Sequence, residues 1–122
     1  MSDTDATVKL FKTLMHPARL EILDILRDGE ECVCHMEAAL GYRQAYISQQ
    51  LMVMREAGLV RDRRDGWNIF YRVVEPKVYT VIDAARAMTE GRATAGRKSA
   101  RPDRIAQCAC PRCNPVAAGA AG

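Results

Sequence analysis

The stretch ECVCHMEAALGYRQAYISQQL, residues 31–51, contains two short helical patterns separated by a glycine. The first pattern begins close to residues 31–34 and runs to Leu40, and Gly41 ends it. The second follows at once and continues to Gly58, with apolar residues at helical spacing. Two short helices joined by a tight turn that contains glycine form a helix-turn-helix. The stretch therefore predicts this motif, with two cysteines at its beginning.

The second helix of the motif is expected to have an apolar and a polar face. The predicted inward residues are Tyr46, Ile47, Leu51, Met54 and Leu59, and the predicted outward residues are Gln44, Ser48, Gln49 and Arg55. Outward amides and hydroxyls are the groups that hydrogen-bond base edges in the major groove. The candidate DNA-contacting residues of this segment are Arg43, Gln44, Ala45, Tyr46, Ser48 and Gln49.

Each of these residue types has a possible contact. Gln44 and Gln49 can bond bidentately to adenine, and Arg43 can bond guanine or phosphate. Ser48 can bond either base edges or phosphate, whereas Ala45 and its neighbour Tyr46 suit thymine methyl groups or the backbone.

A hairpin is expected directly after the motif. The sequence LVRDRRDGWNIFYRVV, residues 59–74, has β-forming residues on both sides of Asp65-Gly66, a dipeptide typical of tight hairpin turns. Its arginines suit phosphates or the minor groove, and the candidate DNA contacts are Arg63, Arg64 and Arg72, with Arg61 beside them. Helix, turn, helix and basic hairpin in this order indicate a winged helix-turn-helix that binds DNA.

Helices are predicted on both sides of this unit. Apolar residues recur at helical spacing from Val8, and Pro17 opens a second helix that ends at Asp28-Gly29. A final helix from about Pro76 to Met88 carries an apolar stripe too wide for a solvated surface. The predicted fold is mainly α with a small β-hairpin, and the stripe predicts a homodimer.

Composition divides the 122-residue chain into two parts. Residues 1–90 are expected to form one winged helix-turn-helix domain for DNA binding and dimerisation. Residues 91–122 contain six basic side chains against one aspartate and are expected to form a basic, flexible tail that contains cysteine. No apolar run is long enough to span a membrane and no export signal is evident, so a cytoplasmic protein with no membrane partner is expected.

Four blocks together carry a family resemblance: LMHPARLEILDIL, ECVCHMEAAL, AYISQQLMVMREAGLV and RDGWNIFYRV. In order and spacing they resemble the ArsR/SmtB family of metal-responsive winged-helix repressors, over roughly residues 8–90. The resemblance implies a homodimer that holds double-stranded operator DNA when metal-free and releases it when an ion binds. It also implies Cys32 and Cys34 as inducer ligands, and it implies no enzymatic activity.

The spacing of the two cysteines predicts a distortion. Residues two apart on an α-helix point about 200° apart, so one ion cannot take both thiolates of a regular helix. Metal binding is therefore expected to bend or unwind the helix start at Cys32 and Cys34. Thiolates suit soft inducers, namely As(III), Sb(III), Cd(II) or Pb(II), with Zn(II) behind them.

A tight site needs more than two thiolates. In the arsenite-responsive pattern that the chain resembles, a third cysteine follows three residues after the pair, but Glu37 occupies that position here. The tail offers Cys108, Cys110 and Cys113 in the sequence CACPRC, from the same or the partner subunit. His35 is either a nitrogen ligand or a partly exposed helix residue. The last helix contains no histidine, so the second metal site of some family members is expected to be absent.

Two alternatives remain open. Oxidation of Cys32 or Cys34 with a tail cysteine would make the same fold a redox-sensing repressor. A thiol oxidoreductase using Cys110 and Cys113 is a remote alternative, because such C-x-x-C motifs normally open a helix in a βαβ setting.

Overall fold

The computed structural model describes residues 2–90, which form five α-helices, one 3-10 helix and three strands. In chain order these elements are α1 (Asp3–Leu14), α2 (Pro17–Ile25), η1 (Leu26–Asp28), β1 (Glu31–Cys32), α3 (Val33–Leu40), α4 (Gln44–Glu56), β2 (Val60–Asp65), β3 (Asn68–Val73) and α5 (Lys77–Glu90). The predicted winged helix-turn-helix, mainly α with a small β-hairpin, is confirmed. The predicted tail cysteines Cys108, Cys110 and Cys113 lie outside the described residues.

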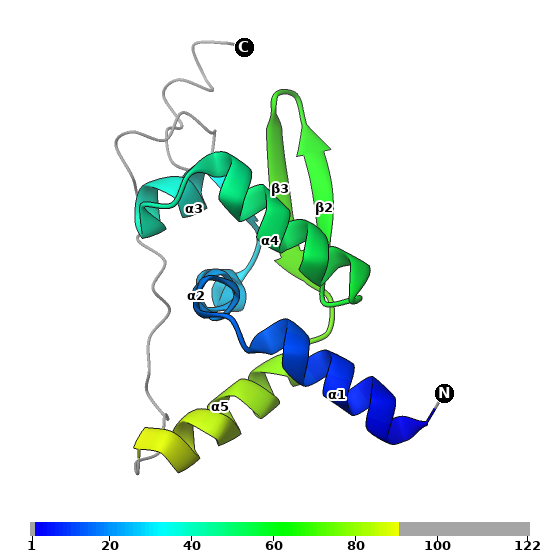
Figure 1. Cartoon of the computed structure of the whole chain (residues 1–122). Coiled ribbons are helices and arrows are strands. Elements are labelled where there is room, and N and C mark those ends of the chain that lie inside the picture. The colour runs from blue at the N-terminus through cyan, green and yellow to red at the C-terminus, as the bar shows by residue number, and fades with distance from the viewer. Residues whose placement is uncertain (1, 91–122) are drawn as a thin grey trace.

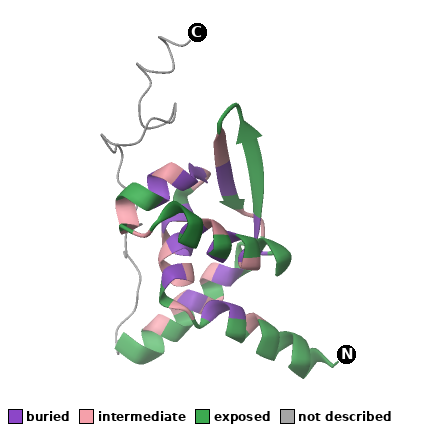
Figure 2. Cartoon of the chain, turned by 45° about the horizontal axis from the view of Figure 1, so that its top comes forward, coloured by how far each residue is buried: buried purple, intermediate pink, exposed green. Residues whose placement is uncertain are grey.

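Helix α2 lies at the centre of the molecule and the other elements surround it (Figure 1). Helices α3 and α4 cover one side, α1 and α5 form the opposite surface, and the β2–β3 hairpin stands beside α4 with its turn extending beyond that helix. Every helix contributes residues to the core, but the first turns of α1 are exposed. The fully buried core residues include Ile22, Leu23, Ile25, Met36, Ile47, Leu51 and Met54. Figure 2 shows the buried positions gathered toward α2.

Short-range sequence signals explain the helix boundaries. The Ser2 hydroxyl accepts a hydrogen bond from the Asp5 amide and caps α1, which therefore begins well before Val8. Pro17 opens α2 as predicted. Gly41 ends α3 in the left-handed region with φ of 77°, a conformation that glycine adopts without a steric cost. Within residues 2–90, no helix is long and apolar enough to cross a membrane.

The three strands form one antiparallel sheet in the order β1-β3-β2. Asp65 pairs with Asn68, so the two turn residues are Gly66 and Trp67, one position later than the predicted turn. Gly66 has φ of 62°, which suits the tight turn. Strand β1 was not predicted as a strand, and it pairs Cys32 with Phe70 of the hairpin. The sheet thus connects the beginning of α3 directly to the wing.

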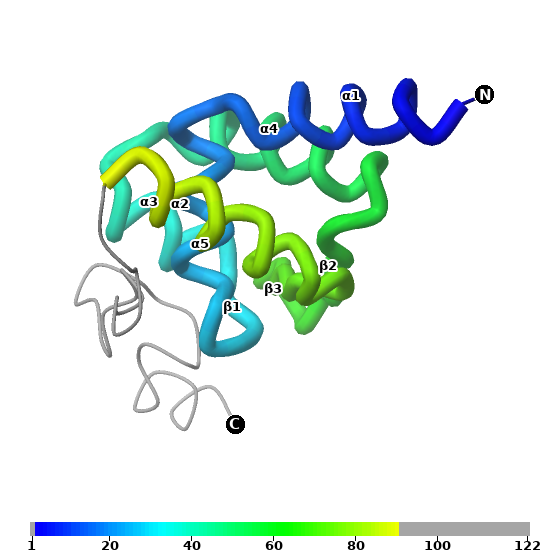
Figure 3. Tube along the Cα trace, turned by 90° about the horizontal axis from the view of Figure 1, so that it is seen from below, coloured from blue at the N-terminus to red at the C-terminus, as the bar shows by residue number. Residues whose placement is uncertain are grey.

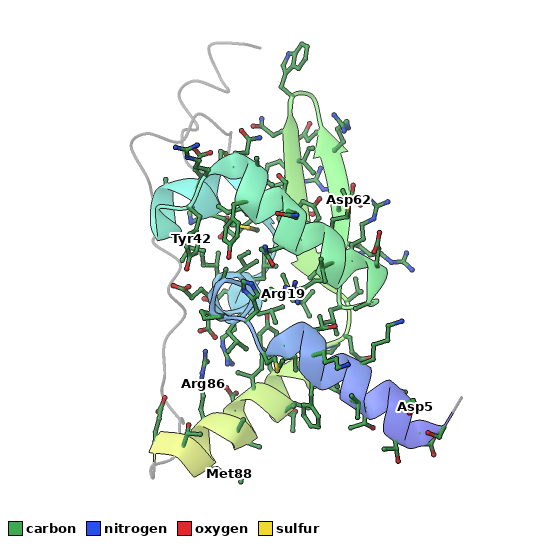
Figure 4. All side chains as sticks on the ribbon, in the orientation of Figure 1. Asp5, Arg19, Tyr42, Asp62, Arg86 and Met88 are labelled. Atoms are coloured by element: carbon green, nitrogen blue, oxygen red, sulfur yellow. A yellow bond between two sulfur atoms is a disulfide. The ribbon has the colours of Figure 1, made fainter. Side chains whose placement is uncertain are left out.

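Helix α5 contributes buried Val78 and Ile82 to the core, and ionic contacts connect it to α2 and η1. Arg86 donates to both carboxylate oxygens of Asp24, at 2.9 and 2.7 Å, and Arg27 bridges Asp24 and Asp83. Figure 4 shows Arg86 directed from α5 toward α2, whereas Met88 points away from the body. The outer side of α5 is therefore left exposed.

Candidate functional site

The outer surface of α4 carries the residues predicted to contact DNA. Arg43 at its N-cap and Gln44, Ala45, Tyr46 and Gln49 are exposed, and Ser48 is half-buried. The opposite side of α4 contributes Ile47, Leu51 and Met54 to the core. The structure thus places the six predicted residues together on the first turns of one helix.

Gln50 fixes the rotation of α4 about its axis. Its side chain is buried, and its Oε1 accepts a hydrogen bond of 2.8 Å from the Nε of Arg19 on α2. Arg19 also donates to the main-chain carbonyl of Thr13 at the end of α1. The neighbouring Gln49 is exposed, as a residue predicted to contact base edges must be.

The inward orientation predicted for Tyr46 is wrong. Its side chain is 36% exposed, and its ring lies against the rings of Tyr42, with centroids 5.2 Å apart, and His16, at 6.4 Å. Tyr42 in turn donates a hydrogen bond of 2.6 Å to Glu21 on α2. Tyr46 directly precedes the buried Ile47. The helical period therefore places Tyr46 at the boundary of the core and not inside the core.

Arg63 of the wing is engaged within the protein. Its guanidinium donates two hydrogen bonds to Glu30, of 2.7 and 3.0 Å, and lies 4.9 Å above the ring of Phe70. The hydrogen bond with Glu30 raises the pKa of Arg63 and lowers that of Glu30. Arg63 therefore ties the hairpin to the segment that precedes β1.

Arg64 and Arg72 lie in different surroundings. Arg64 is exposed and pairs across the strands with Ile69, so it lies on the face of the sheet opposite to that of Arg63. No ion pair of Arg64 is found within residues 2–90. Cross-strand partners share a face, so Arg64 projects on the side of Ile69. Arg72 lies at the base of the hairpin and borders a surface hollow with η1 and Tyr79, at the end remote from the turn. Arg64 is thus the predicted wing cation that is exposed near the turn without an ion pair among residues 2–90.

The two sulfur atoms of the Cys-x-Cys pair meet, contrary to the predicted divergence. Cys32 is not helical: it is the N-cap of α3 in extended conformation, and its Sγ accepts a hydrogen bond of 3.2 Å from the main-chain amide of His35. Cys34 lies in the first turn, and the two cysteines form a disulfide with Cα atoms 5.4 Å apart. The premise that both cysteines are helical is therefore wrong, because the helix begins one residue after Cys32. The bending of the helix start on metal binding stays a prediction.

The surroundings of the pair are mostly buried. Cys32 packs with Phe70 of the wing, and Cys34 is half-buried beside them. His35 is also buried, with Nδ1 3.8 Å from the carboxylate of Glu31, so the expectation of a partly exposed histidine is wrong. In the part of the chain that the structure describes, no group of three or more Cys, His, Asp or Glu side chains is arranged to hold a metal ion.

A cavity of about 140 Å³ connects the thiol pair with both predicted DNA-contacting elements. Its wall includes Cys32 and Cys34, the side chains of Gln44 and Ser48 from α4, and wing residues that include Trp67 and Asn68. The cysteines thus lie close to two of the predicted DNA-contacting residues.

Sequence reasoning missed Trp67 at the turn of the wing. It is the only tryptophan of the chain, and it is 99% exposed. The available signal was a large aromatic residue directly after Asp65-Gly66, at a turn position where small polar residues are usual.

The fold and this surface define a class of protein. A helix-turn-helix whose second helix is exposed and polar, followed by a basic hairpin, is the arrangement of winged helix-turn-helix transcriptional regulators, which bind DNA. The comparisons with known proteins agree with this class. The family model described as "Bacterial regulatory protein, arsR family" matches residues 16–62.

Individual relatives support the same assignment. The biofilm growth-associated repressor of Agrobacterium fabrum is 49% identical over 79 residues, which cover 65% of this chain and 68% of that protein. An arsenic resistance transcriptional regulator of Pseudomonas putida is 38% identical over 97 residues, which cover 79% of this chain and 73% of that protein. The solution structure of a homodimeric winged helix-turn-helix DNA-binding domain from Mycobacterium bovis superposes with a TM-score of 0.64 at 28% identity. The superposition covers 74% of this chain and 88% of that domain. The chain belongs to the arsR family of bacterial regulatory proteins.

Proposed function

We propose that this protein is a repressor that binds double-stranded operator DNA as a homodimer and is released when a thiophilic ion binds its cysteine thiolates. The observation that carries the proposal is the position of Cys32 and Cys34, which share one cavity with Gln44 and Ser48 of α4. A ligand held by the thiols would lie beside the residues that contact DNA. The outward Gln49 would enter the major groove with them, and Arg64 would meet the phosphates.

Dimerisation is proposed through α1 and α5. Exposed apolar side chains lie on α1 (Val8 and Phe11), directly after it (Met15) and on α5 (Met88). Figures 1 and 3 show that α1 and α5 together form the surface opposite the helix-turn-helix. A patch of this kind on one surface is typical of a protein–protein interface. A two-fold dimer through it would leave both copies of α4 outward to read two half-sites.

Cys32 and Cys34 are the proposed first ligands, for As(III) or Sb(III) or else Cd(II) or Pb(II), with Zn(II) less favoured. The two cysteines are joined by a disulfide, so after reduction the same neighbouring positions would offer two thiolates to one ion. Cys108, Cys110 and Cys113 are proposed to supply the remaining thiolate, from either subunit. The proposed domain division, residues 1–90 with a tail of residues 91–122, gives these cysteines a separate segment of chain.

The proposed release begins at Cys32. Its Sγ caps the main-chain amide of His35, and its backbone pairs with Phe70 of the wing. A sulfur that donates its electrons to an ion is a weaker acceptor for that amide, so ligation changes the start of α3 and the position of the wing together. An ordinary allosteric coupling of about 1 to 3 kcal/mol lowers operator affinity roughly 5- to 150-fold.

The test is fluorescence anisotropy of the reduced, metal-free protein on labelled DNA from upstream of its own gene. Arsenite, Cd(II), Pb(II) and Zn(II) are titrated separately, and one ion is expected to release the DNA at near-stoichiometric amounts. A protein with Ser at both positions 32 and 34 is the matched control and should stay bound. Tight binding that none of the four ions changes would contradict the proposal.

A second candidate is redox sensing, which the Cys32–Cys34 disulfide favours. Two thiols lose two electrons and two protons to a peroxide, which is reduced to water, and the two sulfur atoms join. In this candidate the bond forms within the pair and not with a tail cysteine. Peroxide without any metal would release the DNA, and dithiothreitol would restore binding. A chelated, peroxide-treated sample that keeps its affinity would eliminate this candidate.

A further inference from the structure

Trp67 has no role in the folded core. It is the second residue of the two-residue turn between β2 and β3, and 99% of its side chain is exposed. Small polar residues and glycine usually occupy such turns, because they adopt the backbone conformation and stay hydrated. An indole kept in water loses the stabilisation that its burial would give. The side chain therefore contributes little to the stability of the monomer.

The position of Trp67 relates it to the reading helix. Trp67 and its neighbour Asn68 border the same cavity as Gln44 and Ser48 from the first turns of α4. The turn of the wing and the N-terminal part of α4 therefore lie on one side of the molecule, as the hairpin beside α4 in Figure 1 also indicates. A rod-shaped partner laid across Gln44 and Ser48 would meet Trp67.

The charges around the turn identify the kind of partner. Strands β2 and β3 carry four arginines against two aspartates, and Arg64 is exposed near the turn. A cationic hairpin with an apolar tip suits a polyanion that also offers apolar surface. The DNA minor groove has this character, because sugar edges form its walls and phosphates border it, and apolar side chains insert there in other proteins.

We propose that Trp67 is a DNA-contacting residue that packs its indole into the minor groove next to the major groove occupied by α4. The proposal rests on the proposed DNA-binding function and adds to it an apolar contact made by the wing. The contact is independent of charge, so its contribution to affinity should not change with salt, unlike that of Arg64.

The first test uses Trp67 as its own reporter, since the chain has no other tryptophan. Adding unlabelled operator DNA to the reduced protein should quench and shift the tryptophan emission. Netropsin, which occupies the A·T minor groove, should reverse part of this change when added to the complex. Emission that stays the same while anisotropy of labelled DNA reports binding would overturn the proposal.

The second test measures affinity at several salt concentrations for Trp67→Ala, Trp67→Phe and Arg64→Ala. Trp67→Ala should weaken operator binding about tenfold, and this factor should be the same at every salt concentration. Trp67→Phe should recover most of the lost affinity. Arg64→Ala should instead lower the slope of log affinity against log salt by about one. Because Trp67 is exposed, its replacement should leave the fold intact, and circular dichroism of each variant checks that it is folded.

The outcomes separate the two levels of the argument. If wild-type protein does not bind DNA from its own promoter or any related operator, the proposed function itself fails. If wild-type protein binds and Trp67→Ala binds equally well, only the role of Trp67 fails. A Trp67→Ala variant that changes the sedimentation of the free protein would indicate a contact between copies and would also overturn the minor-groove proposal.

Discussion

Asp24 is the residue whose replacement should weaken the attachment of α5 most. Both of its carboxylate oxygens accept hydrogen bonds from Arg86, and Oδ1 also accepts one of 3.1 Å from Arg27. The side chain of Asp24 is only 14% exposed, and those of the two arginines are nearly as buried. We predict that Asp24→Asn, which keeps the size but removes the charge and one acceptor oxygen, destabilises the fold and weakens the dimer.

The magnitude follows from the burial of this cluster. Hydrogen bonds to a charged group contribute about 1.5 to 3 kcal/mol, whereas an exposed ion pair contributes about 0 to 1 kcal/mol. The Arg86 pair is bidentate and mostly buried, but water still reaches it, so part of this energy is screened. We expect Asp24→Asn to lower the free energy of unfolding by about 2 to 3 kcal/mol, between the values for exposed and fully buried pairs.

Urea unfolding at neutral pH measures this change, and sedimentation of the folded protein measures the dimer. Asp83→Asn is the matched control, because Asp83 contacts Arg27 from α5 but is 38% exposed, so its loss should cost less than about 1 kcal/mol. If the two variants have the same stability, or if Asp24→Asn is within about 0.5 kcal/mol of wild type, the ionic attachment of α5 is not what holds it.

The same carboxylate predicts a pH dependence. Burial by itself raises the pKa of Asp24, but hydrogen bonds from Arg86 and Arg27 together outweigh burial and hold the pKa below its ordinary value of 3.8. A depressed folded-state pKa gives stability that is present above the unfolded pKa and is lost as the pH falls through the folded pKa. The stability difference between wild type and Asp24→Asn should therefore shrink below about pH 4. A difference that stays constant from pH 7 to pH 3 would refute this assignment.

Three further predictions concern the candidate site. Cys32→Ser and Cys34→Ser should each leave metal-free operator binding intact and abolish release by the inducer, whereas lost affinity without metal would mean that the cysteines support the fold. Gln49→Ala should weaken binding to the operator by about 1 to 3 kcal/mol in anisotropy titrations, and an equal loss on random DNA would exclude base reading. Arg63→Ala should make the wing more susceptible to proteolysis than Arg64→Ala does, because Arg63 contacts Glu30 and Phe70. Equal rates of cleavage of the two variants would contradict this prediction.

The sequence predicts the helix-turn-helix because its boundaries depend on single residues. Pro17 and Gly41 restrict the backbone locally, and Asp65-Gly66 does the same for the hairpin, so their effect needs no knowledge of distant contacts. Strand β1 was beyond such reasoning. It has only two residues, and what makes it a strand is its pairing with Phe70 and Tyr71, nearly forty positions later.

The geometry of the thiol pair was mispredicted because it depends on where α3 begins to within one residue. With both cysteines helical, their side chains would diverge by about 200°. With Cys32 as an extended N-cap, its sulfur turns back toward the first turn, where Cys34 lies. Cap positions are among the least certain features of a sequence-based prediction. The pairing of the two cysteines in sequence was thus readable, but the geometry that brings their sulfur atoms together was not.

The position of Cys32 supports the proposal that a change at one sulfur alters the predicted DNA-contacting residues. Its backbone belongs to the sheet of the wing through Phe70, its Sγ caps the helix that precedes α4, and the cavity beside it reaches Gln44. Arg63 adds a second connection from the wing to Glu30, just before β1. In the proposed mechanism, a bonding change at Cys32 would therefore affect both the wing and the helix-turn-helix, the two elements proposed to contact the DNA. Coupling between thiol and operator then needs no path through the dimer surface, so it should persist in a variant whose dimer is weakened at α5.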